Sequence, residues 1–226
     1  MKYLFYDLEK ATSKNCGKIC EFGYVVTDEK FNVLERNNFI INPSIEDKDW
    51  DWYAVKKIIT RKVSEYESNL TFNKYYPKIK ELIKTADYVV GHSLDGDAKS
   101  INDECKRYAL PSLNYDFFDI KYIYKALTDQ KECAGLSKIL TELNVEGEDN
   151  AHDAEADAYN TMLALKTMLN HYKTDFETVL TKHPEIKDRT ENYLIDSVEA
   201  RRIKKEESAR RWRMRNRVEK KENKKW

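Results

Sequence analysis

Carboxylates interrupt apolar or tightly patterned segments at three well-separated points of the chain. Asp7 and Glu9 end the first apolar run, and Asp97 follows a later one. Asp157 lies in a third segment, five residues after His152. A buried, ionised carboxylate without a partner is strongly unfavourable. Three segments that each contain such a carboxylate therefore predict a partner that all of them share. A pair of divalent cations is the simplest partner of this kind.

The first segment is predicted to be a strand. Residues 3–6, Tyr-Leu-Phe-Tyr, are strong strand formers. Alternation along a strand places Asp7 and Glu9 on one face and Leu8 on the other. Two carboxylates at this spacing can hold one hard cation such as Mg²⁺ or Mn²⁺. The alternative is a strand whose end is acidic without a function.

The second acidic segment follows a short apolar strand predicted over residues 86–92. Because such a strand is buried on both faces, Asp97 would lie at the rim of a sheet, where open α/β folds bind ligands. Residues 93–101 then lead into a helix. Asp is also a good helix cap, so Asp95 or Asp97 could serve only in that role.

The third segment opens a long helix that continues through Met168. Five residues rotate a helix by about 140°. His152 and Asp157 can therefore act together only if His152 lies in the loop before the helix. Small residues at Ala154 and Ala158 would let the helix approach the sheet and bring Asp157 to the first strand.

Before that helix, two more strands over 19–27 and 33–43 predict an antiparallel meander with the first strand. Residues 50–85 have helical spacing of apolar residues. Trp50, Trp52 and Tyr53 lie at the start of this region and are interpreted as core or lid aromatics, with base stacking as the alternative.

Together these motifs resemble the DnaQ-like, or DEDDh, family of 3′-to-5′ exonucleases. In chain order they are Asp7-Leu8-Glu9, Gly91-His92 with Asp97 five residues after the histidine, and His152 with Asp157 five residues on. Residues 19–23, Ile-Cys-Glu-Phe-Gly, also resemble the strand that follows the family's first motif. The resemblance covers about residues 1–172. It implies a ribonuclease-H-like α/β fold with a central mixed five-stranded sheet flanked by helices.

Two places depart from the family pattern. Residues 10–13 read Lys-Ala-Thr-Ser, where the family commonly has a Thr-Thr-Gly-like turn against the terminal nucleotide. Residues 94–97 read Leu-Asp-Gly-Asp, with an extra acid and a glycine where an aromatic residue often precedes the catalytic aspartate. We assign Asp97 by its distance from His92 and keep Asp95 as the alternative.

The resemblance implies hydrolysis of phosphodiesters with two Mg²⁺ or Mn²⁺ ions. Asp7 would bridge both ions, and Asp97 would support the second through water. Glu9 and Asp157 would hold the ion that binds the attacking water. His152 would be the general base, because an imidazole with its ordinary pKa of about 6.5 suits proton transfer near neutral pH. The products would be nucleoside 5′-monophosphates from the 3′ ends of single-stranded DNA or RNA.

Charge is distributed unevenly although the net charge is zero. Residues 199–226 contain 13 Lys or Arg against five Glu, so the remainder of the chain is acidic. We predict an exonuclease domain over 1–172, a connector over 173–198, and a basic helical or disordered tail over 199–226. The tail could contact phosphates without sequence choice, stack an aromatic ring on a base, or bind a protein partner. The nucleic-acid-binding candidates are Arg210, Arg211, Trp212, Arg213, Arg215 and Arg217.

Two other classes of function stay open at this point. One is a non-catalytic nucleic-acid-binding protein on the same fold, and the other is an accessory subunit of a polymerase or of a mobile-element or defence complex. Backbone contacts from the tail favour DNA over RNA as the substrate. The four cysteines form no metal-binding pair and are interpreted as free thiols of a reducing cytoplasm. No signal peptide and no apolar run near the roughly 20 residues of a membrane span are evident, which predicts a cytoplasmic protein.

Overall fold

In the part of the chain that the structure describes, the sheet is mixed and has six strands in the order β3-β2-β1-β4-β5-β6. The computed structural model describes residues 1–12, 18–128, 130–149 and 152–193. The strands are β1 (Lys2–Lys10), β2 (Ile19–Asp28), β3 (Val33–Ile40), β4 (Tyr88–Gly91), β5 (Asp116–Asp119) and β6 (Lys187–Arg189). β1, β4 and β5 run parallel, whereas β2, β3 and β6 add antiparallel pairs. The predicted mixed sheet is confirmed, with one strand more than the five expected.

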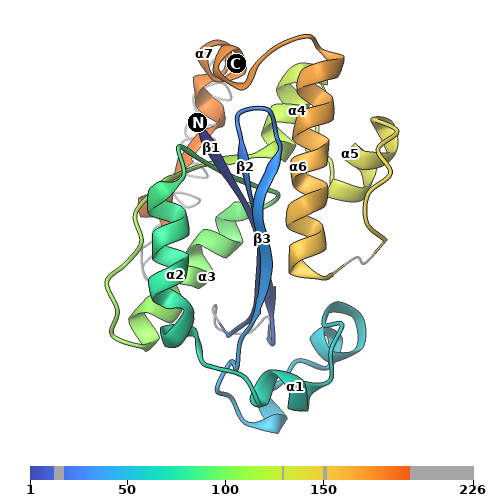
Figure 1. Cartoon of the computed structure of the whole chain (residues 1–226). Coiled ribbons are helices and arrows are strands. Elements are labelled where there is room, and N and C mark those ends of the chain that lie inside the picture. The colour runs from blue at the N-terminus through green and yellow to red at the C-terminus, as the bar shows by residue number, and fades with distance from the viewer. Residues whose placement is uncertain (13–17, 129, 150–151, 194–226) are drawn as a thin grey trace, which may run out of the picture. The chain divides into compact units, whose positions relative to one another are not determined.

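Helices cover both faces of this sheet, as Figure 1 shows. On one face lie α2 (Phe72–Thr85) and α3 (Leu94–Arg107). On the other lie α4 (Ile120–Thr128), α5 (Leu136–Glu142) and α6 (Ala154–His171). The remaining elements are η1 (Asp47–Asp49), η2 (Ala54–Ile58), α1 (Val63–Glu67), α7 (Phe176–Lys182), η3 (Pro184–Ile186) and η4 (Thr190–Tyr193). The region 50–85 is thus helical only in pieces, since η2 is a single π-helical turn that ends before Ile59.

β1 is apolar along most of its length because both of its faces are buried. Leu4 and Tyr6 pack in the core cluster formed with α2 and α3. Tyr3 and Phe5 pack in the cluster formed with α4, α5 and α6. Side chains alternate along a strand, so Asp7 faces the same side as Phe5. The carboxylates of β1 are therefore directed toward the face that α6 covers.

The start of α6 lies against β2 because a glycine occupies the point of contact. A Cβ atom on Gly23 would lie 2.0 Å from the carbonyl carbon of Ala154, which no side chain could tolerate. Ala154 and Ala158 are fully buried, as their small size predicts. Gly23 pairs with Asp7 in the register of β1 and β2. This close contact therefore brings the first turn of α6 to the acidic end of β1.

The compact unit extends to Tyr193, beyond the boundary predicted at residue 172. Phe176 and Ile186 are buried in the same core cluster as α6, and β6 pairs with β5. Residues 173–193, predicted to be part of a connector, therefore belong to the folded unit. The sequence does not reveal this, because the isolated apolar residues of this segment form no periodic pattern. Residues 194–226 lie outside the described residues. They include the tail candidates Arg210, Arg211, Trp212, Arg213, Arg215 and Arg217.

Among the residues that the structure describes, no helix is long and apolar enough to cross a membrane. Cys20 and Cys105 are buried free thiols, and Cys133 is an exposed one.

Candidate active site

Three parallel strands end at one edge of the sheet, and acidic residues gather there. Asp7 and Glu9 lie in the last part of β1, and Asp97 lies in the first turn of α3, soon after β4. The carboxyl ends of parallel strands are where open α/β folds bind ligands. Glu9 is only 7% exposed and Asp97 only 6%. Both carboxylates are thus largely removed from water, as the sequence predicts for groups that share a partner.

The two aspartates at the start of α3 have different surroundings. Asp97 is buried, and the amino group of Lys10 lies 2.8 Å from its Oδ1 atom. The charge of Asp97 also acts on Asp7 and raises its pKa, so these two carboxylates lie close together. The Asp95 side chain is 53% exposed and lies 3.6 Å from Lys121. The geometry therefore favours Asp97 over Asp95 as the member of the acidic cluster.

His152 and Asp157 reach the same place from the start of α6. The backbone N–H of His152 donates to Oδ2 of Asp157 over 3.2 Å. The imidazole Nδ1 lies 3.8 Å from Oε1 of Glu9. His152 precedes the helix and Asp157 lies in its first turn, as the five-residue spacing requires. The half-exposed imidazole thus borders both the carboxylates and the solvent.

Burial raises the pKa of all four carboxylates, and charges within the cluster raise the pKa of Asp7 and Glu9 further. Burial, followed by the charges of Asp97, Glu9 and Asp157, holds the pKa of Asp7 well above its usual value. Burial and neighbouring carboxylates, with Asp157 the strongest, raise the pKa of Glu9 to about 9. Burial is also the main cause that raises the pKa of Asp97 and of Asp157. The cluster therefore has more negative charge than its protein surroundings compensate.

The donor set fits a divalent cation. One ligand atom each from Glu9, His152 and Asp157 lies within 4.8 Å of the other two. Asp7 and Asp97 add two further carboxylates, and carboxylate oxygens are the donors that Mg²⁺ and Mn²⁺ prefer. A bound cation would also offset the repulsion that raises the pKa of these groups. The cluster is therefore a candidate metal site made mainly of oxygen donors.

Divalent cations are expected to stabilise the protein more at pH 8 than at pH 5. The folded-state pKa of Glu9 is about 9, above the unfolded value of about 4.3. Between these values the folded state holds more protons than the unfolded state, so the stability of the metal-free protein falls as the pH rises. A cation replaces these protons, and at about 100 times its Kd it adds about 2.7 kcal/mol. Thermal unfolding with EDTA, Mg²⁺ or Mn²⁺ at both pH values measures the difference.

Asp7→Asn serves as the matched variant for this experiment. It removes a donor and also part of the repulsion, so it should lose most of the metal-dependent stabilisation. Equal stabilisation of the wild type at both pH values would show that the cations bind elsewhere.

A pocket of about 440 Å³ opens beside Glu9. It is lined by Leu8, Glu9, Lys10, Thr12, Asp51, Tyr53, Ala54 and Ile58. Tyr53 is 59% exposed on its wall, and the neighbouring Trp52 is also exposed, whereas Trp50 is a core residue. The volume lies within the roughly 300–1,000 Å³ of small-molecule sites. The site thus combines an acidic cluster with a mostly apolar pocket that has one aromatic wall.

Several charged residues around the site were not singled out from the sequence. Lys10 is the last residue of β1 and begins the segment that departs from the family pattern, and Arg61 and Asp153 belong to no motif. Glu21 has a detectable signal, because it interrupts an apolar strand as Asp7 does. Lys10 and Arg61 have no such signal, since their partners are distant in the chain.

Comparisons with known proteins agree with this architecture. The family model RNase_T, described as an exonuclease, matches residues 4–165, a range that contains the whole acidic cluster. The nuclease domain of 3′hExo, described as a DEDDh family member bound to rAMP, is similar with a TM-score of 0.64 at 14% identity, over 75% of this chain and 92% of that chain. No curated protein sequence is significantly similar to the chain.

Two nuclease structures with DNA are also similar. Exonuclease X in complex with 5′-overhanging duplex DNA has a TM-score of 0.58 at 15% identity, over 79% of this chain and 96% of that chain. Exonuclease I of E. coli in complex with a dA16 oligonucleotide has a TM-score of 0.62 at 18% identity, over 80% of this chain and 42% of that chain. At such low identities the likeness concerns the fold.

Proposed function

The chain belongs to the exonuclease family that its residues 4–165 match, within the DEDDh, or DnaQ-like, group, and from this we propose that it is a metal-dependent 3′-to-5′ exonuclease. It would release nucleoside 5′-monophosphates one at a time from single-stranded 3′ ends. One observation carries the proposal. Four carboxylates and an imidazole from three distant segments converge at the ends of the parallel strands. A protein that only binds nucleic acid has no need of a cluster whose members repel one another.

The proposed reaction is attack of water on the last phosphodiester. Divalent cations held by the four carboxylates would activate the water and stabilise charge on the leaving 3′ oxygen when bound. His152 would accept the proton of the water, because its imidazole borders both Glu9 and the solvent. The bond between phosphorus and the 3′ oxygen breaks. The upstream strand keeps a 3′-hydroxyl, and the terminal nucleotide leaves with its 5′-phosphate.

The pocket beside Glu9 is proposed to hold the terminal nucleotide, with Tyr53 against its base. Tyr53→Ala is expected to raise KM about 5- to 150-fold, since stacking of a base on an aromatic ring contributes about 1–3 kcal/mol. The turnover number should change little, because Tyr53 is proposed to contact only the base and none of the reacting atoms. Steady-state kinetics on short oligonucleotides measures both values. Tyr53→Phe keeps the ring and should behave as the wild type; an unchanged KM in Tyr53→Ala would place the base elsewhere.

Residues 199–226 are proposed to add phosphate contacts that do not depend on sequence. Their 13 basic residues outnumber five glutamates. Truncation after Val198 is expected to raise KM on long substrates and to flatten its dependence on salt, because fewer phosphates are neutralised. Very short oligonucleotides should be cleaved as before. If the truncated protein binds long DNA and RNA equally well across a salt series, a protein partner is the better explanation of the tail.

Labelled substrates test the proposed function directly. The purified protein is incubated with matched 5′-labelled and 3′-labelled single-stranded DNA and RNA, in the presence of Mg²⁺, Mn²⁺ or EDTA. A 3′-to-5′ exonuclease shortens the 5′-labelled strand to a ladder and frees the 3′ label at once as a mononucleotide. DNA is the expected preference, and the RNA arm tests it. Cleavage that persists in EDTA would contradict the proposed mechanism.

A further inference from the structure

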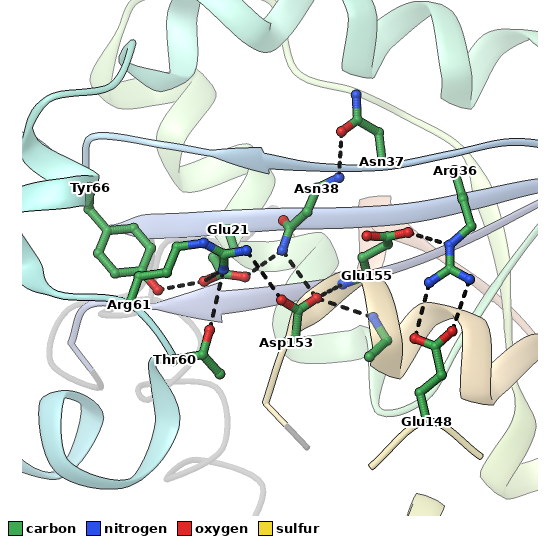
Figure 2. A network of polar contacts seen from close by, with 11 residues as sticks. Glu21, Arg36, Asn37, Asn38, Thr60, Arg61, Tyr66, Glu148, Asp153 and Glu155 are labelled. Carbon is green, nitrogen blue, oxygen red and sulfur yellow. Dashed lines mark hydrogen bonds and ion pairs between the residues drawn. The ribbon is translucent and has the colours of Figure 1, made fainter. Parts of the chain in front are cut away.

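Arg61 connects the carboxylates of Glu21 and Asp153 (Figure 2). Glu21 pairs with Glu9 between β1 and β2, and Asp153 follows His152 in the chain. The Nη1 atom of Arg61 lies 2.8 Å from Oε1 of Glu21, and its Nη2 atom lies 3.4 Å from Oδ2 of Asp153. Glu21 lies on β2, Asp153 caps α6, and Arg61 follows the π-helical turn η2. One guanidinium group therefore links three segments that are distant in the chain.

Glu21 fixes one end of this link. It is fully buried and lies opposite Glu9 in the register of β1 and β2. Besides Arg61, it accepts hydrogen bonds from the hydroxyl of Tyr66 and, over 2.6 Å, from Nδ2 of Asn38. A buried carboxylate with this many donors has little freedom to move. The Glu21 side of the link is therefore a rigid reference point beside β1.

Asp153 forms the other end, one residue after His152. Its Oδ1 atom accepts the backbone N–H groups of Glu155 and Ala156 as the cap of α6, and its Oδ2 atom accepts from Arg61. Nδ2 of Asn38, which donates to Glu21, also donates to Oδ1 of Asp153 over 3.3 Å, a weaker second link between the two carboxylates. The backbone of His152 has a φ of 68°. This is the left-handed region, which is unfavourable for residues other than glycine and is kept when surrounding contacts stabilise it. The contacts of Asp153, the next residue, restrain the same stretch of backbone, as does the hydrogen bond from His152 to Asp157.

We infer that Arg61 is a positioning residue, which sets the His152 imidazole relative to Glu9 by tying Asp153 to Glu21. This inference rests on the proposed function for its kinetic effect, although the geometry it describes does not. Arg61 is not needed to cap α6, since the cap uses the other oxygen of Asp153. A guanidinium group can bond two carboxylates at once, whereas an ammonium group is a single point charge on a flexible stem.

A second arginine holds the same region from another strand. Arg36 on β3 donates to Glu155 through Nε and to Glu148 through Nη1 and Nη2, over 3.0 and 3.1 Å. Figure 2 shows both groups of contacts around the start of α6. If the Arg36 contacts were sufficient to place His152, changes at Arg61 would have no effect on turnover. The two arginines therefore give the inference a clear alternative.

Arg61→Lys and Asp153→Asn test it, with Arg107→Lys as the matched control. In Arg61→Lys, the ammonium group keeps a positive charge beside Glu21 but cannot also bond Asp153. In Asp153→Asn, the amide oxygen still caps α6, but the negative charge that attracts Arg61 is lost. Arg107 likewise contacts a nearly buried carboxylate, Glu104, over 3.3 Å, with a similar side-chain exposure of 25% against 30% for Arg61. Glu104 lies near the far end of α3, away from the acidic cluster.

Each test variant is expected to lower the turnover number about 10- to 100-fold, the range for residues that orient active-site groups. KM and Mn²⁺ affinity should change little, and the double variant should be no slower than either single one. The control should keep wild-type turnover even if its melting temperature falls. A wild-type turnover number in Arg61→Lys would overturn the inference. So would a turnover number that falls in proportion to the melting temperature in all variants, the Arg107→Lys control included.

NMR of the histidine rings keeps this result separate from the proposed function. The chain has four histidines, and His152→Ala assigns the relevant signal. The His152 signal should shift in Arg61→Lys and in Asp153→Asn but not in Arg107→Lys. An inactive wild type would remove the proposed function, whereas an unshifted His152 signal in both test variants would overturn the inference.

Discussion

Asp7→Asn is expected to lower the turnover number by about 10³-fold or more. Asp7 is the carboxylate whose pKa responds to Asp97, Glu9 and Asp157 together, so it lies at the centre of the cluster. Asparagine has nearly the same shape but no charge to hold a cation. Loss of several kcal/mol of charge stabilisation in the transition state corresponds to this factor, at about 1.36 kcal/mol for each tenfold.

The same change should not unfold the protein. Burial and repulsion hold the pKa of Asp7 above its usual value, so its ionised form opposes folding at neutral pH. Asparagine removes that opposition, and the melting temperature in EDTA should stay equal or rise. Asp95→Asn is the matched control, because Asp95 is exposed, and it should keep near wild-type turnover. Full activity in Asp7→Asn, or loss of activity only in Asp95→Asn, would refute the assignment of the cluster.

His152→Ala is expected to lower the turnover number by about 10²- to 10⁴-fold, the usual contribution of a general acid or base. The imidazole lies beside Glu9 and is half exposed, so it can receive a proton from a water in the cluster and pass it to solvent. The dependence of turnover on pH should lose its acidic limb, which reports the protonation of a base. Single-turnover cleavage of a labelled oligonucleotide measures the effect without interference from product release.

Calorimetric titration with Mn²⁺ separates this role from that of a metal ligand. A nitrogen of the imidazole lies within 4.8 Å of oxygen atoms of Glu9 and Asp157, close enough for the three to hold one ion. The geometry therefore allows His152 to be a general base or a metal ligand. A general base predicts nearly unchanged Mn²⁺ affinity in His152→Ala. A large loss of affinity would make His152 a ligand instead. His183→Gln, at a histidine paired with Glu185, controls for the loss of an imidazole as such.

The periodicity of side chains explains why the local geometry of the segments that carry the candidate site could be predicted. An apolar strand with acids at alternate positions places Asp7 and Glu9 on one face, whatever the rest of the chain does. The five-residue spacing places His152 before α6, and the small Ala154 predicts the close contact with the sheet. These features depend on bonds and packing within a few residues, so the sequence is sufficient to predict them.

Features that depend on isolated residues could not be predicted in the same way. The exposure of Tyr53 on the pocket wall depends on where a single π-helical turn begins. The addition of β6 to the sheet depends on pairing with β5 across about 70 residues of chain, as the bond between Arg189 and Asp116 illustrates with a separation of 73. Neither leaves a periodic pattern in the segment concerned.

The sequence by itself determined the family, the central strand and the three segments that carry the carboxylates and the histidine, because motifs and periodicity are local. Only the tertiary structure showed that Asp97 is buried beside Lys10 whereas Asp95 is exposed, and that Arg61 joins Glu21 to Asp153. The contacts of Arg61 span 40 and 92 residues of chain. Their energy arises only when the folded backbone has brought the charges together out of water, so no pattern of neighbouring residues records them.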